Sequence, residues 1–275
     1  MSGKRDPISY LFVPASRPDR YGKACDSAAD AVIIDLEDAV AADEKDEALE
    51  HLRNALEQGL PRPVHVRINS ADSRWFDRDI AMLDEISESA RDCIAGVFVP
   101  KAEDPDTIER VRAVLGAAAE IVPIIESAAG VARVEDLSAV RGVTRFAVGA
   151  ADLSFDLDTD IASATIDWVY ARLVVASRVA GLAAPVGSPP FEIKNLDAVR
   201  REAVRLRGLG ATAQLCIHPA QIAPILAGFL PSAERVDWAR RVMSSGGGGA
   251  SQVDGQMIDK PLWERARRIL AQAAR

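Results

Sequence analysis

Residues 145–156 read RFAVGAADLSFD, and this stretch decides how the chain folds. It opens as a short apolar strand, breaks at Gly149 into small residues, and brings Asp152 to the end of the strand. One strand-and-helix unit upstream, residues 120–126 (EIVPIIE) form another apolar run, which ends in Glu126. Two adjacent strands that each end in a carboxylate predict an oxygen site for a hard divalent ion such as Mg²⁺.

Short apolar runs of this kind recur along the chain, at residues 9–15, 31–37, 63–69, 96–102, 120–126, 145–150, 182–188 and 213–219. Their centres lie roughly 20 to 40 residues apart, which is the length of a strand with its crossover helix. Segments between them, such as residues 43–58 and 164–180, carry apolar residues at helical spacing. No G-x-G-x-x-G motif follows the first strand, so a dinucleotide-binding sheet is not indicated. We therefore expect an α/β fold, a (β/α)₈ TIM barrel.

The barrel is expected to occupy residues 1–230, followed by a C-terminal helical extension at residues 231–275. Two helical patterns in the extension are separated by SSGGGGAS at residues 244–251. The four glycines at residues 246–249 cannot pack in a core. This run is either a surface linker or a hinge that lets the extension swing over an active site.

Composition excludes several classes of protein. The chain has 275 residues, of which 48% are hydrophobic and 27% charged, as in a soluble globular protein. The net charge of −8 argues against nucleic acid or an anionic membrane as a partner. No apolar run reaches the roughly 18 residues of a membrane span, and the N-terminus lacks a signal-peptide core. The three cysteines fit neither a disulfide framework nor a zinc site, so we expect reduced thiols in a cytoplasmic protein.

In such a barrel the chemistry lies at the C-terminal ends of the strands. Glu126 and Asp152 are the candidate metal ligands, because their small neighbours leave room for a substrate and for water on the metal. A single carboxylate there would more often be a helix cap or part of a surface ion pair. Arg17 and Lys23 flank a helix N-terminus, which suits a phosphate, although such charges are usually only solvated.

Arg67 lies in a run where His65, Arg67 and Asn69 face one way by strand alternation. An inward-pointing arginine needs an anion. That anion is either a substrate carboxylate or enolate, or a structural partner in Glu37 or Asp38. Glu37 and Asp38 could also hydrogen-bond to water around the metal.

Motifs along the chain resemble one known family, the citrate lyase beta-subunit family within the HpcH/HpaI aldolase superfamily. This family includes malyl-CoA and citramalyl-CoA lyases and stand-alone citrate-lyase-like proteins. The resemblance runs in order from about residue 9 to about residue 270. It is carried by LFVPASRPDRYGKA, DAVIIDLEDAV, VRINS, GVFVPKAE, PIIESAAG, VGAADLSFDL, CIHPAQI and DGQMIDKP.

The resemblance implies a (β/α)₈ barrel that assembles as a homotrimer or hexamer and uses Mg²⁺. Members of the family cleave or form a carbon–carbon bond between an acyl-CoA and a 2-oxo acid such as oxaloacetate. Glu126 and Asp152 match the Mg²⁺ ligands, and Glu126 and Arg67 match residues that bind the substrate. Arg17 and Lys23 fall where family members contact the phosphates of coenzyme A.

Asp259 resembles a catalytic aspartate that the extension of one subunit delivers to the site of its neighbour, so the extension is expected to pack on another subunit. The chain also departs from the family pattern. Gln214 stands where many members have lysine, Ile8 replaces a common arginine, and VGSPPFEIKN at residues 186–195 replaces a segment that usually carries an aspartate. We expect these departures near the region that faces coenzyme A.

The leading hypothesis is a Mg²⁺-dependent carbon–carbon lyase acting on citryl-CoA, malyl-CoA or citramalyl-CoA. Arg67 would stabilise negative charge, and Asp259 would move a proton at the α-carbon of the acyl-CoA. One alternative is condensation with thioester hydrolysis, as in malate synthase or a thioesterase. Others are a non-catalytic subunit that binds 2-oxo acids or acyl-CoA, and an aldolase acting on substrates without coenzyme A.

Overall fold

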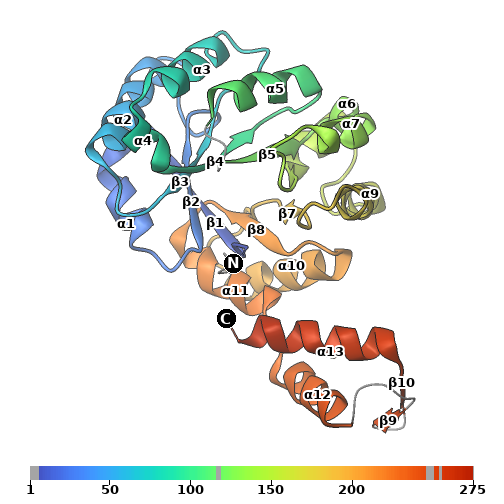
Figure 1. The fold of residues 1–275 in the computed structure, drawn as a ribbon. Coiled ribbons are helices and arrows are strands. Elements are labelled where there is room, and N and C mark those ends of the chain that lie inside the picture. The colour runs from blue at the N-terminus through green and yellow to red at the C-terminus, as the bar shows by residue number, and fades with distance from the viewer. Residues whose placement is uncertain (1–5, 116–118, 246–250, 254–255, 275) are drawn as a thin grey trace.

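The computed structural model describes residues 6–115, 119–245, 251–253 and 256–274. Eight parallel strands close into one barrel, each hydrogen-bonded to the next and β8 back to β1 (Figure 1). The expected (β/α)₈ barrel is therefore confirmed. The strands are β1 (Ser9–Pro14), β2 (Ala31–Asp35), β3 (Val64–Arg67), β4 (Ile94–Val99), β5 (Glu120–Ile125), β6 (Ala147–Val148), β7 (Val186–Gly187) and β8 (Ala213–Cys216).

Helices follow the strands and form the outer layer of the barrel (Figure 1). Helix boundaries match the local sequence, because α10 begins where the Asn195 side chain accepts the Ala198 N–H and ends at Gly210 with a φ of 104°. The helices around the barrel are η1 (Pro18–Arg20), α1 (Tyr21–Cys25), α2 (Lys45–Gln58), α3 (Phe76–Glu85), α4 (Glu88–Asp92), α5 (Pro105–Val114), α6 (Ala128–Ala132), α7 (Val134–Ala139), α8 (Ala150–Asp156), α9 (Ala164–Ala180), α10 (Leu196–Leu209), η2 (Pro219–Gln221) and α11 (Ile222–Phe229).

Side chains that alternate along the strands fill the interior of the barrel. Tyr10, His65 and Phe98 meet edge to face there, with ring centroids 5.4 to 5.6 Å apart. The same alternation carries Asp35 and Arg67 into the interior one layer higher, where they are partners in the register of β2 and β3. The lower interior is thus a packed core, and Asp35 and Arg67 bring charge to the layer at the C-terminal mouth.

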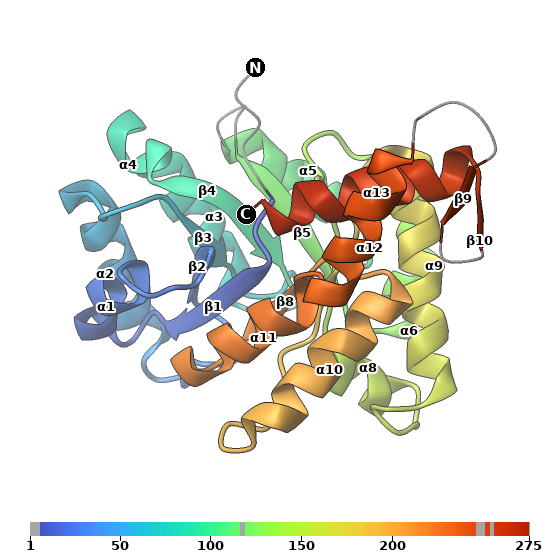
Figure 2. The ribbon, with the colours of Figure 1, turned by 90° about the horizontal axis from the view of Figure 1, so that it is seen from below.

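The chain after the barrel forms a helical pair, α12 (Ala233–Ser244) and α13 (Lys260–Ala273), with a hairpin of β9 (Ser251–Val253) and β10 (Gln256–Ile258) between them. Figure 2 shows α13 on the side where the N-terminal end of β1 lies, and α8, which follows β6, on the other side. The extension therefore lies away from the mouth of its own barrel. The glycine run at residues 246–249 falls outside the described residues. In the described segments, no helix is long and apolar enough to span a membrane.

Candidate metal and substrate site at the barrel mouth

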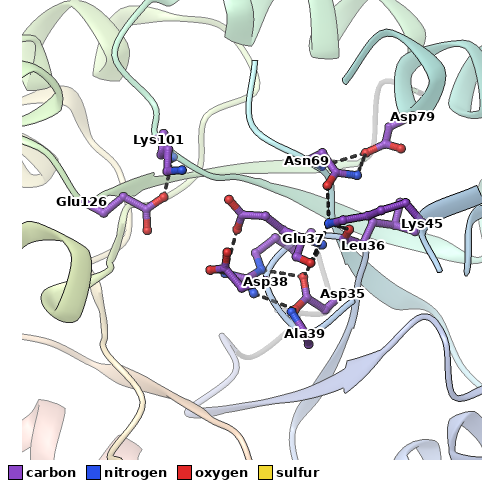
Figure 3. A network of polar contacts seen from close by, with 11 residues as sticks. Asp35, Leu36, Glu37, Asp38, Ala39, Lys45, Asn69, Asp79, Lys101 and Glu126 are labelled. Carbon is purple, nitrogen blue, oxygen red and sulfur yellow. Dashed lines mark hydrogen bonds and ion pairs between the residues drawn. The ribbon is translucent and has the colours of Figure 1, made fainter. Parts of the chain in front are cut away.

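Glu126 follows β5 and is buried, with 6% of its surface exposed. Its Oε1 accepts the backbone N–H of Lys101 at 2.7 Å (Figure 3). Lys101 has a φ of 44°, a left-handed conformation that is uncommon for a residue with a side chain. Burial raises the pKa of Glu126 to about 7, the hydrogen bond from Lys101 opposes this rise, and the charge of Asp152 adds to it. The two candidate ligands are thus close enough to interact.

Asp152 lies in the first turn of α8, which begins directly after Gly149. A Cβ atom at position 149 would lie 2.7 Å from the Cβ of Glu126 and would collide with its Oε2. Only glycine therefore leaves room for the Glu126 carboxylate beside the start of α8. This break in the strand, which the sequence showed as a change to small residues, is what brings both carboxylates to one place.

Arg67 is held by carboxylates at the end of β2. Its Nε donates to Asp35 Oδ1 at 2.7 Å and its Nη2 to Asp35 Oδ2 at 2.6 Å. Its Nη1 lies 2.9 Å from Glu37 Oε2 and 3.5 Å from Asp38 Oδ2, and its Cζ is 4.7 Å from the centroid of the Phe12 ring. The structural pairing left open by the sequence is present, but its main partner is Asp35, which the sequence reading did not single out. A role for Arg67 in binding substrate stays a prediction.

Lys45, at the start of α2, anchors the loop that carries these carboxylates (Figure 3). Its Nζ donates to the carbonyls of Leu36 and Glu37, at 2.5 and 2.7 Å, and to Asn69 Oδ1 at 2.6 Å. The Asn69 side chain in turn donates to Asp79 at 2.8 Å. The expectation that Asn69 faces the same way as Arg67 is therefore wrong. Strand β3 ends at Arg67, and Asn69 turns outward to this buried network.

Glu37 belongs to the same wall and is 6% exposed. Burial raises its pKa to about 8, against the opposing effect of the Arg67 charge, while the charge of Asp38 raises it further. Asp38 is exposed at the rim. The predicted role of Glu37 and Asp38, hydrogen bonding to water around a metal, stays a prediction.

A cavity of about 400 Å³ opens at the mouth. Its lining combines charged groups with an apolar wall and includes Phe12, Asp35, Asp38, Arg67, Glu126, Gly149, Asp152, Ser188, Phe191 and Ile217. The described residues contain no cluster of three or more His, Cys, Asp or Glu side chains arranged around one ion. Mg²⁺ needs only one or two protein carboxylates, with water and substrate oxygens completing its shell. The Glu126 and Asp152 pair beside the space left by Gly149 fits that requirement.

A second cavity, of about 550 Å³, adjoins the first and shares Phe12, Pro14 and Ile217 with it. Arg17 and Lys23 both line this second cavity, as does Arg20, which the sequence reading missed. Arg17 is partly neutralised, because its Nε and Nη2 each donate to Asp19 at 2.9 Å. The expected basic pair therefore lies on one wall next to the mouth.

The departures from the family pattern lie in different places. Gln214 is fully buried in β8, and its Nε2 donates to the Ser188 carbonyl at 3.0 Å. Ile8 precedes β1 and lines a cleft at the other end of the barrel, not the basic cavity beside the mouth. Strand parity could not show this, because Ile8 comes before the strand begins.

Asp259 is the N-cap of α13, where its Oδ1 accepts the Leu262 N–H at 3.2 Å. It belongs to the extension, which lies on the side of the barrel away from the mouth (Figure 2). The structure of one chain therefore does not bring Asp259 to Glu126. Its predicted catalytic role requires a second copy of the chain.

Comparisons with known proteins cover nearly the whole chain. A family model described as HpcH/HpaI aldolase/citrate lyase matches residues 9–219. A citrate lyase subunit beta-like protein of Deinococcus radiodurans is 31% identical, over 97% of this chain and 97% of the relative. An L-malyl-CoA/beta-methylmalyl-CoA lyase of Cereibacter sphaeroides is 31% identical, over 96% of this chain and 93% of the relative. Protein CitE from Mycobacterium tuberculosis, solved in complex with magnesium, acetoacetate and coenzyme A, has a TM-score of 0.84 at 28% identity and covers 98% of each chain.

Proposed function

The chain belongs to the HpcH/HpaI aldolase/citrate lyase family, and on this premise we propose that it is a Mg²⁺-dependent carbon–carbon lyase of the citrate lyase beta-subunit type. It would cleave or form a 3-hydroxyacyl-CoA such as citryl-CoA, malyl-CoA or citramalyl-CoA, with an acyl-CoA and a 2-oxo acid as the other side of the reaction. One observation carries the proposal: Glu126, Asp152 and Arg67 line a single cavity at the barrel mouth.

In this proposal Glu126 and Asp152 hold the metal, and bound Mg²⁺ would polarise the carbonyl of the 2-oxo acid. Arg67 lies across the cavity and supplies positive charge where the enolate oxygen develops. Its orientation is fixed before substrate arrives, because Asp35 and the Phe12 ring hold the guanidinium. A donor that needs no reorganisation stabilises a transition state more than a mobile one.

The acyl-CoA would lie in the adjoining basic cavity. Arg17, Arg20 and Lys23 would contact its phosphates, and the shared wall of Phe12 and Ile217 would guide the thioester toward the mouth. The related CitE structure was solved with coenzyme A, which supports an acyl-CoA as the substrate. Asp259 from a second copy would take the proton from the α-carbon in condensation and return it in cleavage.

The test is a cleavage panel with citryl-CoA, malyl-CoA and citramalyl-CoA, with and without Mg²⁺, in which the acyl-CoA and 2-oxo acid products are quantified by mass spectrometry. We expect Glu126→Gln and Asp152→Asn to lose turnover and Mg²⁺-dependent binding of the 2-oxo acid by calorimetry. Asp160→Asn is the matched control, because this exposed carboxylate lies just beyond α8 and outside the cavity.

Other outcomes assign the alternatives. Release of free coenzyme A in step with turnover would indicate a malate-synthase-like or thioesterase activity. Ligand binding without turnover of any acyl-CoA would indicate a non-catalytic subunit. Unchanged Mg²⁺ and 2-oxo acid binding in both carboxylate variants would refute the site itself.

A further inference from the structure

A separate cleft of about 650 Å³ lies at the end of the barrel opposite the mouth. One wall comes from residues that precede the strands, such as Ile8 before β1 and Thr212 before β8. The other wall comes from the extension, through Arg235 on α12 and Arg265 on α13. The cleft therefore lies between the barrel and the extension, at the level where Figure 2 shows α13 beside the start of β1.

The charges that line this cleft are unbalanced. Arg207, Arg235 and Arg265 line it, and Asp6 is the one carboxylate of the described residues that does so. Three guanidinium groups against one carboxylate leave a net charge of +2, in a chain whose overall charge is −8.

Two of these arginines, Arg235 and Arg265, differ from their neighbours on the same helices. Arg240 on α12 pairs with Asp237 at 3.0 Å, and Arg267 on α13 pairs with Glu264 at 3.2 Å. Within the described part of the chain, neither Arg235 nor Arg265 forms an ion pair. Carboxylates are thus available along both helices, but they pair with arginines outside the cleft.

Arg207, the third arginine, lies close to Arg235 and has no carboxylate partner among the described residues. Its Nη1 donates to the Leu230 carbonyl at 2.9 Å, which is a neutral acceptor. Burial lowers the pKa of Arg207, and the nearby charge of Arg235 lowers it further. Like charges that share a concave, partly desolvated space repel each other. An anion bound between them would offset that repulsion.

We propose that this cleft binds a small organic dianion, at a site distinct from the carboxylate cavity at the mouth. Phosphate and carboxylate groups both match the forked donors of arginine. The apolar part of the lining, which includes Ile8 and Phe229, would contact the carbon skeleton of the ligand. The ligand would touch Arg207 on the barrel side and Arg235 and Arg265 on the extension side, so its binding ties the two together.

The test uses the full chain without Mg²⁺, with glycerol 3-phosphate as the phosphate-type probe and succinate as the dicarboxylate probe in calorimetry. We expect one of them to bind the wild-type chain, with an affinity that falls as salt rises. The double variant Arg235→Gln with Arg265→Gln should bind at least about tenfold more weakly. The matched control, Arg240→Gln with Arg267→Gln, removes the same charge from the same helices and should bind within about twofold of the wild type.

Hydrogen exchange on the wild-type chain gives a second readout that does not depend on any variant. The bound probe should protect α13 and the backbone around Thr212, which form the two walls. Equal affinity of the two double variants, protection only at the mouth, or no binding of either probe at millimolar concentration would each overturn the proposal. A further outcome is that the double variant Arg235→Gln with Arg265→Gln changes the oligomeric mass and binds the anion as the wild type does. That result would also overturn the proposal, because the cleft would then be a contact between subunits. Loss of lyase activity bears on the mouth site alone.

Discussion

The Asp35 carboxylate accepts two hydrogen bonds from the Arg67 guanidinium, of 2.7 and 2.6 Å. The two residues are direct partners in the register of β2 and β3. The same carboxylate accepts the backbone N–H groups of Glu37 and Ala39, at 2.9 and 3.1 Å. One buried side chain therefore orients the arginine and shapes the loop at the end of β2. Asp35 is a positioning residue, because it acts on the cavity through Arg67.

Asp35→Asn is expected to lower the free energy of unfolding by about 1 to 3 kcal/mol, because a neutral amide is a weaker partner for the guanidinium while Glu37 still pairs with it. Urea denaturation measures this loss. Asp19→Asn is the control, because Asp19 binds Arg17 with the same forked geometry at the surface, and its midpoint should not change measurably. Equal shifts in both variants would show that burial of the Asp35 pair is unimportant.

Gly149→Ala should displace the Glu126 carboxylate, because the added Cβ collides with Glu126 Oε2. We expect Mg²⁺-dependent binding of a 2-oxo acid to weaken at least about tenfold in calorimetry, since one ligand loses its position. Gly208→Ala controls for the substitution itself, because a Cβ at position 208 meets nothing within 4 Å. Retained affinity in Gly149→Ala would mean that Glu126 does not hold the metal in the observed position.

Asp79 should make stability depend on pH. Burial raises its pKa from 3.8 to about 6, while hydrogen bonds from Asn69 oppose the rise. The folded chain thus holds this proton more tightly than the unfolded chain. The resulting stability is complete below about pH 3.8 and is lost as the pH rises through 6, by roughly 3 kcal/mol in all.

Urea denaturation of the wild type and of Asp79→Asn between pH 4 and 7 measures this effect, because the variant lacks the titrating group. The difference in unfolding free energy between the two should shift in favour of the variant as the pH rises. Asp84→Asn, an exposed position on the same helix, should run parallel to the wild type. A constant difference between wild type and Asp79→Asn would contradict the raised pKa.

Lys23→Ala and Arg20→Ala test the basic cavity. On the proposed function, each should raise the KM for the acyl-CoA about 3- to 30-fold with little change in kcat, because a phosphate contact is made equally in the ground and transition states. The binding of Mg²⁺ with a 2-oxo acid should not change, since neither residue lines the mouth cavity. An unchanged KM in both variants would show that coenzyme A does not bind at this wall.

Much of the fold could be predicted from the sequence, because strands buried on both faces read as short apolar runs. The run at residues 182–188 was expected to be longer than β7, which comprises only Val186–Gly187. Pro185 lacks an N–H group and Pro189 follows closely, so the ladder of hydrogen bonds is short there. Helix α9 matched its predicted boundaries because Ser163 caps its start and Gly181, with a φ of 74°, ends it.

The site residues that end a strand could be predicted from the sequence. Those whose role depends on the direction of a side chain could not. Glu126 and Asp152 were found because each ends an apolar run. Asp35 was missed because three acidic residues crowd the end of β2, although Ile33 facing the interior would have pointed to Asp35 by parity. Lys45 gave no signal, because two of its three acceptors are backbone carbonyls.

The position of the extension, away from the mouth of its own barrel, has a consequence for how the enzyme would behave in solution. On the proposed function, specific activity should fall on dilution, because a lone chain lacks its proton carrier. Mixing two inactive proteins, Glu126→Gln and Asp259→Asn, should restore about one quarter of the sites by complementation after subunit exchange. Each rescued site would join an intact mouth to an intact aspartate from a different polypeptide.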